Sequence, residues 1–76
     1  MNWRERITVD PKILVGKPII KGTRISVEFI IGLLARGSTA EQILREYDHL
    51  TLEDICACLA YAGELVQEER VYPLPA

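Results

Sequence analysis

The fold is decided by residues 26–37, SVEFIIGLLARG, a stretch that is apolar almost throughout. The serine at its start can accept hydrogen bonds from the free amides of a first helical turn, and the glycine at its end can adopt the left-handed conformation that stops a helix. Between them, Glu28, Gly32 and Arg36 recur at intervals of four and form one narrow polar stripe. The stretch therefore predicts a helix that is buried on most of its sides.

A chain of 76 residues cannot easily surround such a helix. A domain of this size buries only about 60% of the surface that its unfolded chain exposes, so it needs a disulfide, a metal or a partner chain. Cys56 and Cys58 lie about 200° apart around a helix, so their thiols point apart, and His49 is the only histidine. We therefore expect a homodimer that holds no metal or cofactor. The expected interface residues are Phe29, Ile30, Leu33, Tyr61 and Leu65.

Two more helices are predicted downstream of the first. One begins at the capping box Ser38-Thr39-Ala40-Glu41 and runs to about Tyr47. The next begins after Thr51, with Asp54 placed to bond back to the cap, and ends near Arg70. Apolar residues form two stripes along it, which suggests one stripe for the core and one for a partner. The stripes are Leu52, Ile55, Leu59, Ala62 and Val66, and Cys58, Tyr61 and Leu65.

The first 25 residues carry short β-branched runs interrupted by glycine and proline, which is typical of strands and turns. Strands are expected over 7–9 and 13–15, and Pro18 indicates an edge position because it cannot donate to a ladder. The sequence thus predicts a mainly α fold, a small helix-turn-helix-like three-helix domain with a short N-terminal β element, over residues 1–70. Two prolines favour an extended tail over 71–76.

The charges are divided unevenly along the chain. Residues 1–24 contain six basic and two acidic residues, whereas residues 25–76 contain three basic and nine acidic residues. Basic side chains on a hairpin can contact phosphates, so the N-terminal segment is the candidate DNA-binding site. Its candidate residues are Lys12, Lys17, Lys21, Thr23 and Arg24. The alternative is that the glycines shape a turn, the lysines keep an edge strand soluble, and Arg24 pairs with Glu28.

The second and third helices have the spacing of a helix-turn-helix. The third helix is nevertheless poorly suited to DNA, because Glu53 and Asp54 occupy its first turn and it has no lysine or arginine before Arg70. Guanine edges are usually recognised by arginine or lysine. The alternative for this helix is a role in packing.

Residues 16–25, GKPIIKGTRI, carry a specific resemblance. This stretch resembles the signature of a small bacterial family known as domain of unknown function 433, often described as VapB-type antitoxins. The resemblance continues through residues 34–37, 43–47 and 50–55, and spans roughly residues 5–66. It implies a compact helical domain with an N-terminal β element, commonly dimeric, that acts with a neighbouring toxin of PIN-like nuclease fold.

The apolar tail residues are the candidate toxin-binding segment, because antitoxins of this kind lay a short C-terminal segment on their toxin. These residues are Val71, Tyr72 and Leu74. The alternative is a terminus that is disordered or packed in the dimer. We therefore expect an antitoxin-like regulatory protein that neutralises a PIN-like nuclease toxin and binds DNA as a dimer. A protein-interaction module without DNA binding is the alternative.

Other classes of protein are not indicated by the sequence. No nucleophile, metal set or phosphate loop can be assembled, so we expect neither an enzyme nor a small-molecule substrate. No apolar run of about 18 residues is present, so no membrane span is expected. Free cysteines and the lack of an export signal favour the cytoplasm.

Overall fold

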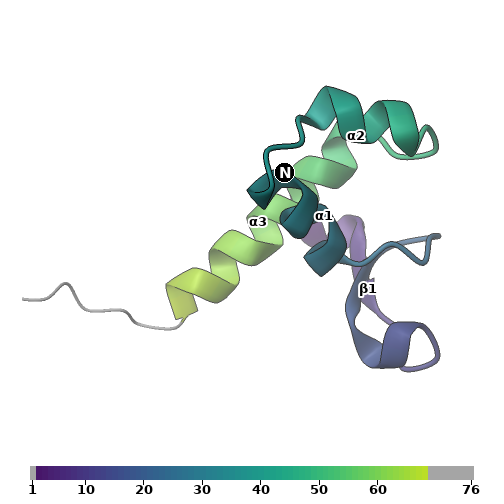
Figure 1. Ribbon diagram of the computed structural model, residues 1–76. Helices are drawn as coiled ribbons and strands as arrows, with labels where there is room; N and C mark the ends of the chain where they lie inside the picture. Colours follow the sequence, from purple (N-terminus) through teal and green to yellow (C-terminus); the bar gives the residue numbers. More distant parts are fainter. Residues whose placement is uncertain (1, 69–76) are drawn as a thin grey trace, which may run out of the picture.

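The structure is a computed structural model that describes residues 2–68. Figure 1 shows one long helix, with the other elements gathered around its N-terminal half while its C-terminal half projects from the body. This arrangement confirms a mainly helical domain with a short N-terminal β element, whereas the predicted tail and the helix end near Arg70 lie outside the described residues. The elements are η1 (Trp3–Glu5), β1 (Ile7–Val9), η2 (Leu14–Gly16), β2 (Pro18–Ile20), α1 (Val27–Ala35), α2 (Ala40–Glu46) and α3 (Leu52–Glu68).

The β element is a two-stranded antiparallel sheet in which Ile7 pairs with Ile20 and Val9 with Pro18. The strand expected over 7–9 is confirmed, but the strand expected over 13–15 is wrong, because this segment is the 3-10 turn η2. Leu14 and Val15 have φ angles of 50° and 56°, in the left-handed region. The chain must reverse between two paired strands here, and this requirement overrides the β preference of the side chains.

The first helix has the caps that its sequence predicts. The Ser26 Oγ accepts a hydrogen bond from the Phe29 amide at 2.9 Å. Gly37 lies just beyond the end of α1 with a φ angle of 97°, a conformation that glycine adopts without a steric penalty.

The second helix begins one residue later than predicted. Thr39 rather than Ser38 is the cap, and its partner is Gln42 rather than Glu41. The Gln42 amide donates to the Thr39 Oγ1 at 3.1 Å, and the Thr39 amide donates to the Gln42 Oε1 at 2.8 Å. The helix therefore starts from a reciprocal pair of hydrogen bonds, as expected of a capping box.

The core lies between α1, the sheet and the N-terminal half of α3. Ile30 and Cys58 are both 0% exposed at its centre. The expectation that Ile30 belongs to a dimer interface is therefore wrong, because its side chain is wholly covered inside the subunit. The buried cluster comprises Ile7, Ile20, Val27, Ile30, Ile43, Leu50, Ile55, Ala57 and Cys58.

The two aromatic residues expected at a dimer interface, Phe29 and Tyr61, also have partners inside the subunit. Tyr61 meets Trp3 edge-on, with ring centroids 4.9 Å apart, and Phe29 meets Tyr47 in the same way at 5.8 Å. Each of these contacts joins distant parts of the chain, and edge-on pairs of this kind stabilise a fold beyond the area that they bury. Both aromatic side chains therefore contribute to the monomer, although each retains exposed surface.

The first predicted stripe of α3 does not face the core as a unit. Ile55 is 2% exposed, but Leu52, Leu59 and Val66 are 53%, 50% and 62% exposed. The elements η1 and α1 pack against the side of α3 that carries Ala57 and Cys58. The core-facing direction is therefore rotated away from the predicted stripe, and three large apolar side chains remain on the surface.

A charged clamp ties the N-terminus to the start of α3. The Arg6 Nη1 donates to the Asp54 Oδ1 at 3.0 Å, and the Thr51 amide donates to the Asp54 Oδ2 at 3.0 Å. The Asp54 amide in turn donates to the Thr51 Oγ1 at 3.3 Å, which confirms the predicted cap. Only 12% of the Asp54 side chain is exposed, so both oxygens of a nearly buried carboxylate have partners.

We expect Asp54→Ala to lower the free energy of unfolding by about 2 kcal/mol, because it removes the cap and leaves Arg6 without its partner. Urea denaturation followed by circular dichroism measures this loss. Glu53→Ala, the same change at the exposed neighbouring residue, is the matched control and should stay within about 0.5 kcal/mol of the parent. Equal losses for the two variants would contradict the clamp.

We expect Val15→Gly to raise the free energy of unfolding by about 0.5–1 kcal/mol. A β-branched residue in the left-handed region costs roughly 1–2 kcal/mol, which exceeds the entropy that glycine loses on folding. The Val15 side chain is 97% exposed, so its removal sacrifices almost no packing. Val9→Gly, in the paired strand β1, is the control and should lower stability in the same thermal unfolding measurement.

The two cysteines should differ sharply in reactivity. Burial, reinforced by the negative charge of Asp54, raises the pKa of the Cys58 thiol from 9.0 to about 12, whereas Cys56 is exposed. A disulfide reagent at pH 8 should therefore modify one thiol per folded chain and two in denaturant. Above pH 9 the unfolded chain releases a proton that the folded chain retains, so stability should fall between pH 9 and 12. Cys58→Ala should remove that contribution.

Candidate nucleic-acid interface

The candidate site is a basic arm, defined here as residues 10–24, which connects β1 to β2 and forms the turn after β2. The turn is built by Thr23, whose Oγ1 donates to the Ile20 carbonyl at 2.8 Å and accepts from the Ile25 amide at 3.0 Å. Gly22 supplies the left-handed residue of this turn, with a φ angle of 78°. The Thr23 hydroxyl is therefore engaged within the turn, so its role here is to hold the neighbouring cations in place.

The other end of the arm is held by an aspartate. The Asp10 Oδ1 accepts from the Lys12 amide at 2.9 Å, and the Asp10 carbonyl accepts from the Ile13 amide at 2.9 Å. This local turn fixes the backbone of Lys12 and leaves its side chain exposed.

Two of the cations expected to contact DNA, Lys17 and Arg24, differ in whether they pair with a carboxylate. The Lys17 Nζ lies 2.9 Å from the Glu28 Oε2, and both side chains are largely exposed. The alternative pairing of Arg24 with Glu28 is not the one that the structure shows. An exposed pair of this kind contributes about 1 kcal/mol or less, but it neutralises part of the charge that Lys17 brings to the arm.

Lys21 and Arg24 lie exposed on the turn after β2. Among residues 2–67, no carboxylate lies within 4.0 Å of the charged nitrogens of Lys12, Lys21 or Arg24. Arg24 also lines two surface hollows, one shared with Ile13 and the other with Leu14. The structure thus brings Arg24, on the turn after β2, next to residues of the β1–β2 connection, the segment that also carries Lys12.

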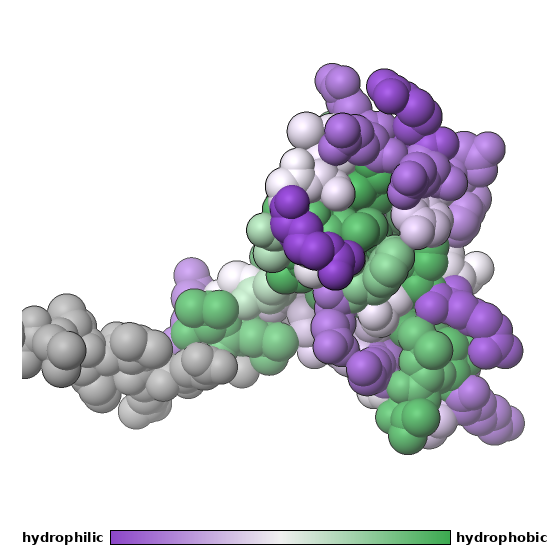
Figure 2. Space-filling view, in the orientation of Figure 1, coloured by the Kyte–Doolittle hydropathy of each residue, from purple (hydrophilic) through white to green (hydrophobic). Residues whose placement is uncertain are grey.

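An exposed apolar tip lies within the basic arm. Val15 is 97% exposed and Leu14 is 39% exposed, at the left-handed turn η2. Figure 2 shows hydrophobic surface at this corner of the molecule, flanked by hydrophilic residues. The β-branched run of this segment predicts a strand instead, so the exposed tip could not be anticipated from the sequence.

The helix-turn-helix interpretation of α2 and α3 gains no support from the exposed residues. The described part of α3 contains no lysine or arginine, and Glu53 is exposed at its first turn. Asp54 is occupied by the clamp with Arg6. An acidic helix start repels phosphate, which argues against DNA recognition by α3. The role of α3 is therefore packing against the domain, and the basic arm remains the candidate interface.

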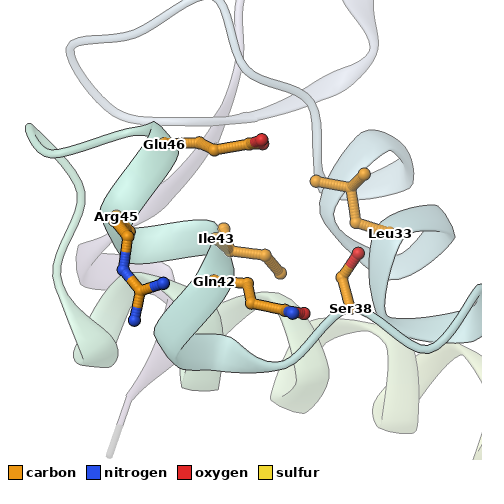
Figure 3. A pocket seen from close by; sticks show the side chains of 6 residues that line it. All are labelled: Leu33, Ser38, Gln42, Ile43, Arg45 and Glu46. Atoms are coloured by element: carbon orange, nitrogen blue, oxygen red, sulfur yellow. The ribbon is translucent and has the colours of Figure 1, made fainter.

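A hollow of about 310 Å³ separates the end of α1 from α2. Figure 3 shows Glu46 reaching toward the side of α1 while Arg45 points away from Leu33. The Gln42 amide group in its lining is already used in the cap of α2. Over residues 2–68, no group of three or more metal-ligating side chains comes together, in this hollow or elsewhere. None of the described helices combines the length and the apolar character needed to cross a bilayer.

The proteins to which this chain is similar are described as uncharacterized or as members of a family of unknown function. A solved structure described as a DUF433 member protein from Anabaena variabilis ATCC 29413 superimposes with a TM-score of 0.77 at 27% identity, covering 83% of this chain and 62% of that one. The uncharacterized protein y4eO of Sinorhizobium fredii is 36% identical over 59 residues, which are 78% of this chain. An uncharacterized protein of Archaeoglobus fulgidus is 67% identical over 24 residues, which are 32% of this chain and 67% of that protein.

The lengths of these proteins differ from that of this chain. The match spans only 27% of the Sinorhizobium protein, so the relative extends well beyond the shared domain. The family model described as "Protein of unknown function (DUF433)" matches residues 7–62, from β1 to the middle of α3. The chain therefore belongs to the DUF433 family.

Proposed function

We propose that this protein is an antitoxin-like regulatory protein that binds DNA through its basic arm and neutralises a PIN-like nuclease toxin in the cytoplasm. The observation that carries the DNA-binding part is the exposure of Lys12, Lys21 and Arg24 on one arm, without carboxylate partners among the described residues. Lysine and arginine contacts to phosphates supply most of the sequence-independent affinity for DNA.

The rigidity of the arm favours this role. Hydrogen bonds of Asp10 and Thr23 fix the backbone on which the cations stand. A surface that is ordered before binding loses less conformational entropy on contact with its ligand. If three cations contact phosphates, the logarithm of the binding constant should fall with the logarithm of salt concentration with a slope of about −3 per chain.

The toxin-neutralising part rests on the family resemblance and on the acidic character of α3. Glu53 and Glu64 lie on this helix, and Glu64 retains exposed surface beside Arg4. An acidic surface complements the basic surface with which a nuclease holds RNA. The proposed toxin-binding residues Val71, Tyr72 and Leu74 follow α3 in sequence and lie outside the described residues.

A protein-interaction module without DNA binding is the second candidate. It is favoured by the acidic first turn of α3, which is unlike a recognition helix. The two candidates differ in one measurable property, because only the first requires the arm cations for affinity to DNA.

We expect the double variant Lys21→Glu with Arg24→Glu to bind DNA at least about 10-fold more weakly than the parent, because two attractive contacts become repulsive. Fluorescence anisotropy with a duplex from the protein's own promoter, at several salt concentrations, measures the loss and the slope. The control is Arg36→Glu with Arg45→Glu, which makes the same charge change at exposed residues outside the arm. Equal losses in both double variants would argue against the arm. A parent that binds no DNA but co-purifies with the product of the adjacent gene would favour the second candidate.

A further inference from the structure

One face of α3 carries an uninterrupted row of exposed residues at the spacing of a coiled-coil seam. The row, here called the α3 seam, consists of Leu52, Cys56, Leu59, Gly63 and Val66. Its members are separated alternately by four and three residues, which keeps them on one line along a helix that pairs with another helix.

Every member of the α3 seam is exposed in the subunit. Leu52, Leu59 and Val66 each leave at least half of their surface uncovered, because the core packs on the opposite side, at Ala57 and Cys58. Figure 1 shows that the C-terminal half of α3 projects beyond the body, and Figure 2 shows hydrophobic surface on this projecting part. A long apolar row on a protruding helix marks an interaction surface.

We propose that the α3 seam binds the α3 seam of a second copy of this chain in an antiparallel pair. In an antiparallel pair the second helix presents its seam residues in the reverse order, so its intervals of four and three residues also run in reverse. The intervals then coincide in two registers: one places Leu52 opposite Gly63 and Cys56 opposite Leu59, and the other places Cys56 opposite Val66 and Leu59 opposite Gly63. We assign the second register. This register uses the projecting half of α3 and keeps the two bodies at opposite ends of the pair.

The sizes of the seam residues favour the antiparallel direction. In this register Leu59 faces Gly63 and Val66 faces Cys56, so each of these two large side chains enters the space beside a small residue. In a parallel pair, each residue would face its own copy. Gly63 would then lie opposite Gly63 and leave a gap between two bulky layers, which costs packing energy.

The charges on α3 do not oppose this pairing. The residues that flank the seam in the described part of α3 are uncharged, apart from Glu53 near its start. These flanking residues are Glu53, Ile55, Ala60, Ala62 and Gln67. Glu64 lies on another side of the helix, where its Oε2 is 3.8 Å from the Arg4 Nη2. The acidic helix can therefore approach its own copy without bringing carboxylates into opposition.

The size of the seam indicates how strong the pair should be. The paired stretch, from Cys56 to Val66, rises about 15 Å. A helix pair this short buries less than the roughly 1,200 Å² of a standard interface, so we expect a weak dimer with a dissociation constant of about 10–100 μM. This inference does not depend on DNA binding or on a toxin, and its tests need neither.

The first test introduces a charge at the centre of the seam. Leu59→Asp should raise the dimer dissociation constant at least about 100-fold in sedimentation equilibrium, because it places a carboxylate in an apolar contact. The side chain is half exposed, so circular dichroism should show an unchanged fold. Val15→Asp adds the same charge at an exposed apolar residue on the basic arm and should leave the dimer intact. A parent that stays monomeric at about 1 mM, or a Leu59→Asp variant that still pairs normally, would overturn the proposal.

The second test establishes the direction of the helices. In the proposed register the two Cys56 thiols are about 15 Å apart along the axis, so the parent should form no disulfide-linked dimer on oxidation. Val66→Cys should form one readily, through Cys56 of the other copy. The same change combined with Cys56→Ser should form none, which controls for random collision. A Cys56–Cys56 disulfide in the parent would overturn the proposed register, because only a parallel pair or a different antiparallel register brings these two thiols together.

Discussion

The packing of α1 across the N-terminal half of α3 is the contact on which the rest of the structure depends. Ile30 of α1 and Cys58 of α3 are completely buried where the two helices meet. The sheet and η1 complete the cover of this region, and α2 packs against the start of α3. A chain of 76 residues has too little material to cover all 17 residues of α3 in the same way. One side of the helix is therefore committed to the subunit, and the opposite side is left exposed for a partner.

The uneven charge of the chain is partly neutralised within the subunit. Arg4 and Arg6 are paired with carboxylates of α3, and Lys17 is paired with Glu28 of α1. These pairs attach the basic N-terminal segment to the acidic helices. The cations that remain are those on the two turns of the basic arm, so the geometry confines the excess positive charge to a smaller region than the sequence suggests.

Local features of the fold could be predicted from the sequence, but features that depend on distant contacts could not. The caps at Ser26 and Thr51 were identified because the donor and the acceptor of each hydrogen bond lie only three residues apart, so the local sequence is enough to predict the bond. The cap of α2 was placed one residue early because Ser38 and Thr39 are both good caps with a suitable partner three residues later. The turn at Leu14 and Val15 was missed because the pairing of Val9 with Pro18, nine residues apart along the chain, imposes it.

The exposed face of α3 is another feature that depends on distant contacts and could not be predicted from the sequence. Helical spacing places Leu52, Leu59 and Val66 on one line, but it does not determine which line faces the core. That direction is set by the side from which α1 and η1 approach, and their approach buries Ala57 and Cys58 instead. The original expectation of a partner for this small domain therefore keeps its physical basis, while the proposed contact moves from a set of residues shared by α1 and α3 to the exposed seam of α3. A pair formed there would stabilise the folded chain by mass action and would relate the two basic arms by a two-fold axis, the symmetry of a palindromic DNA site.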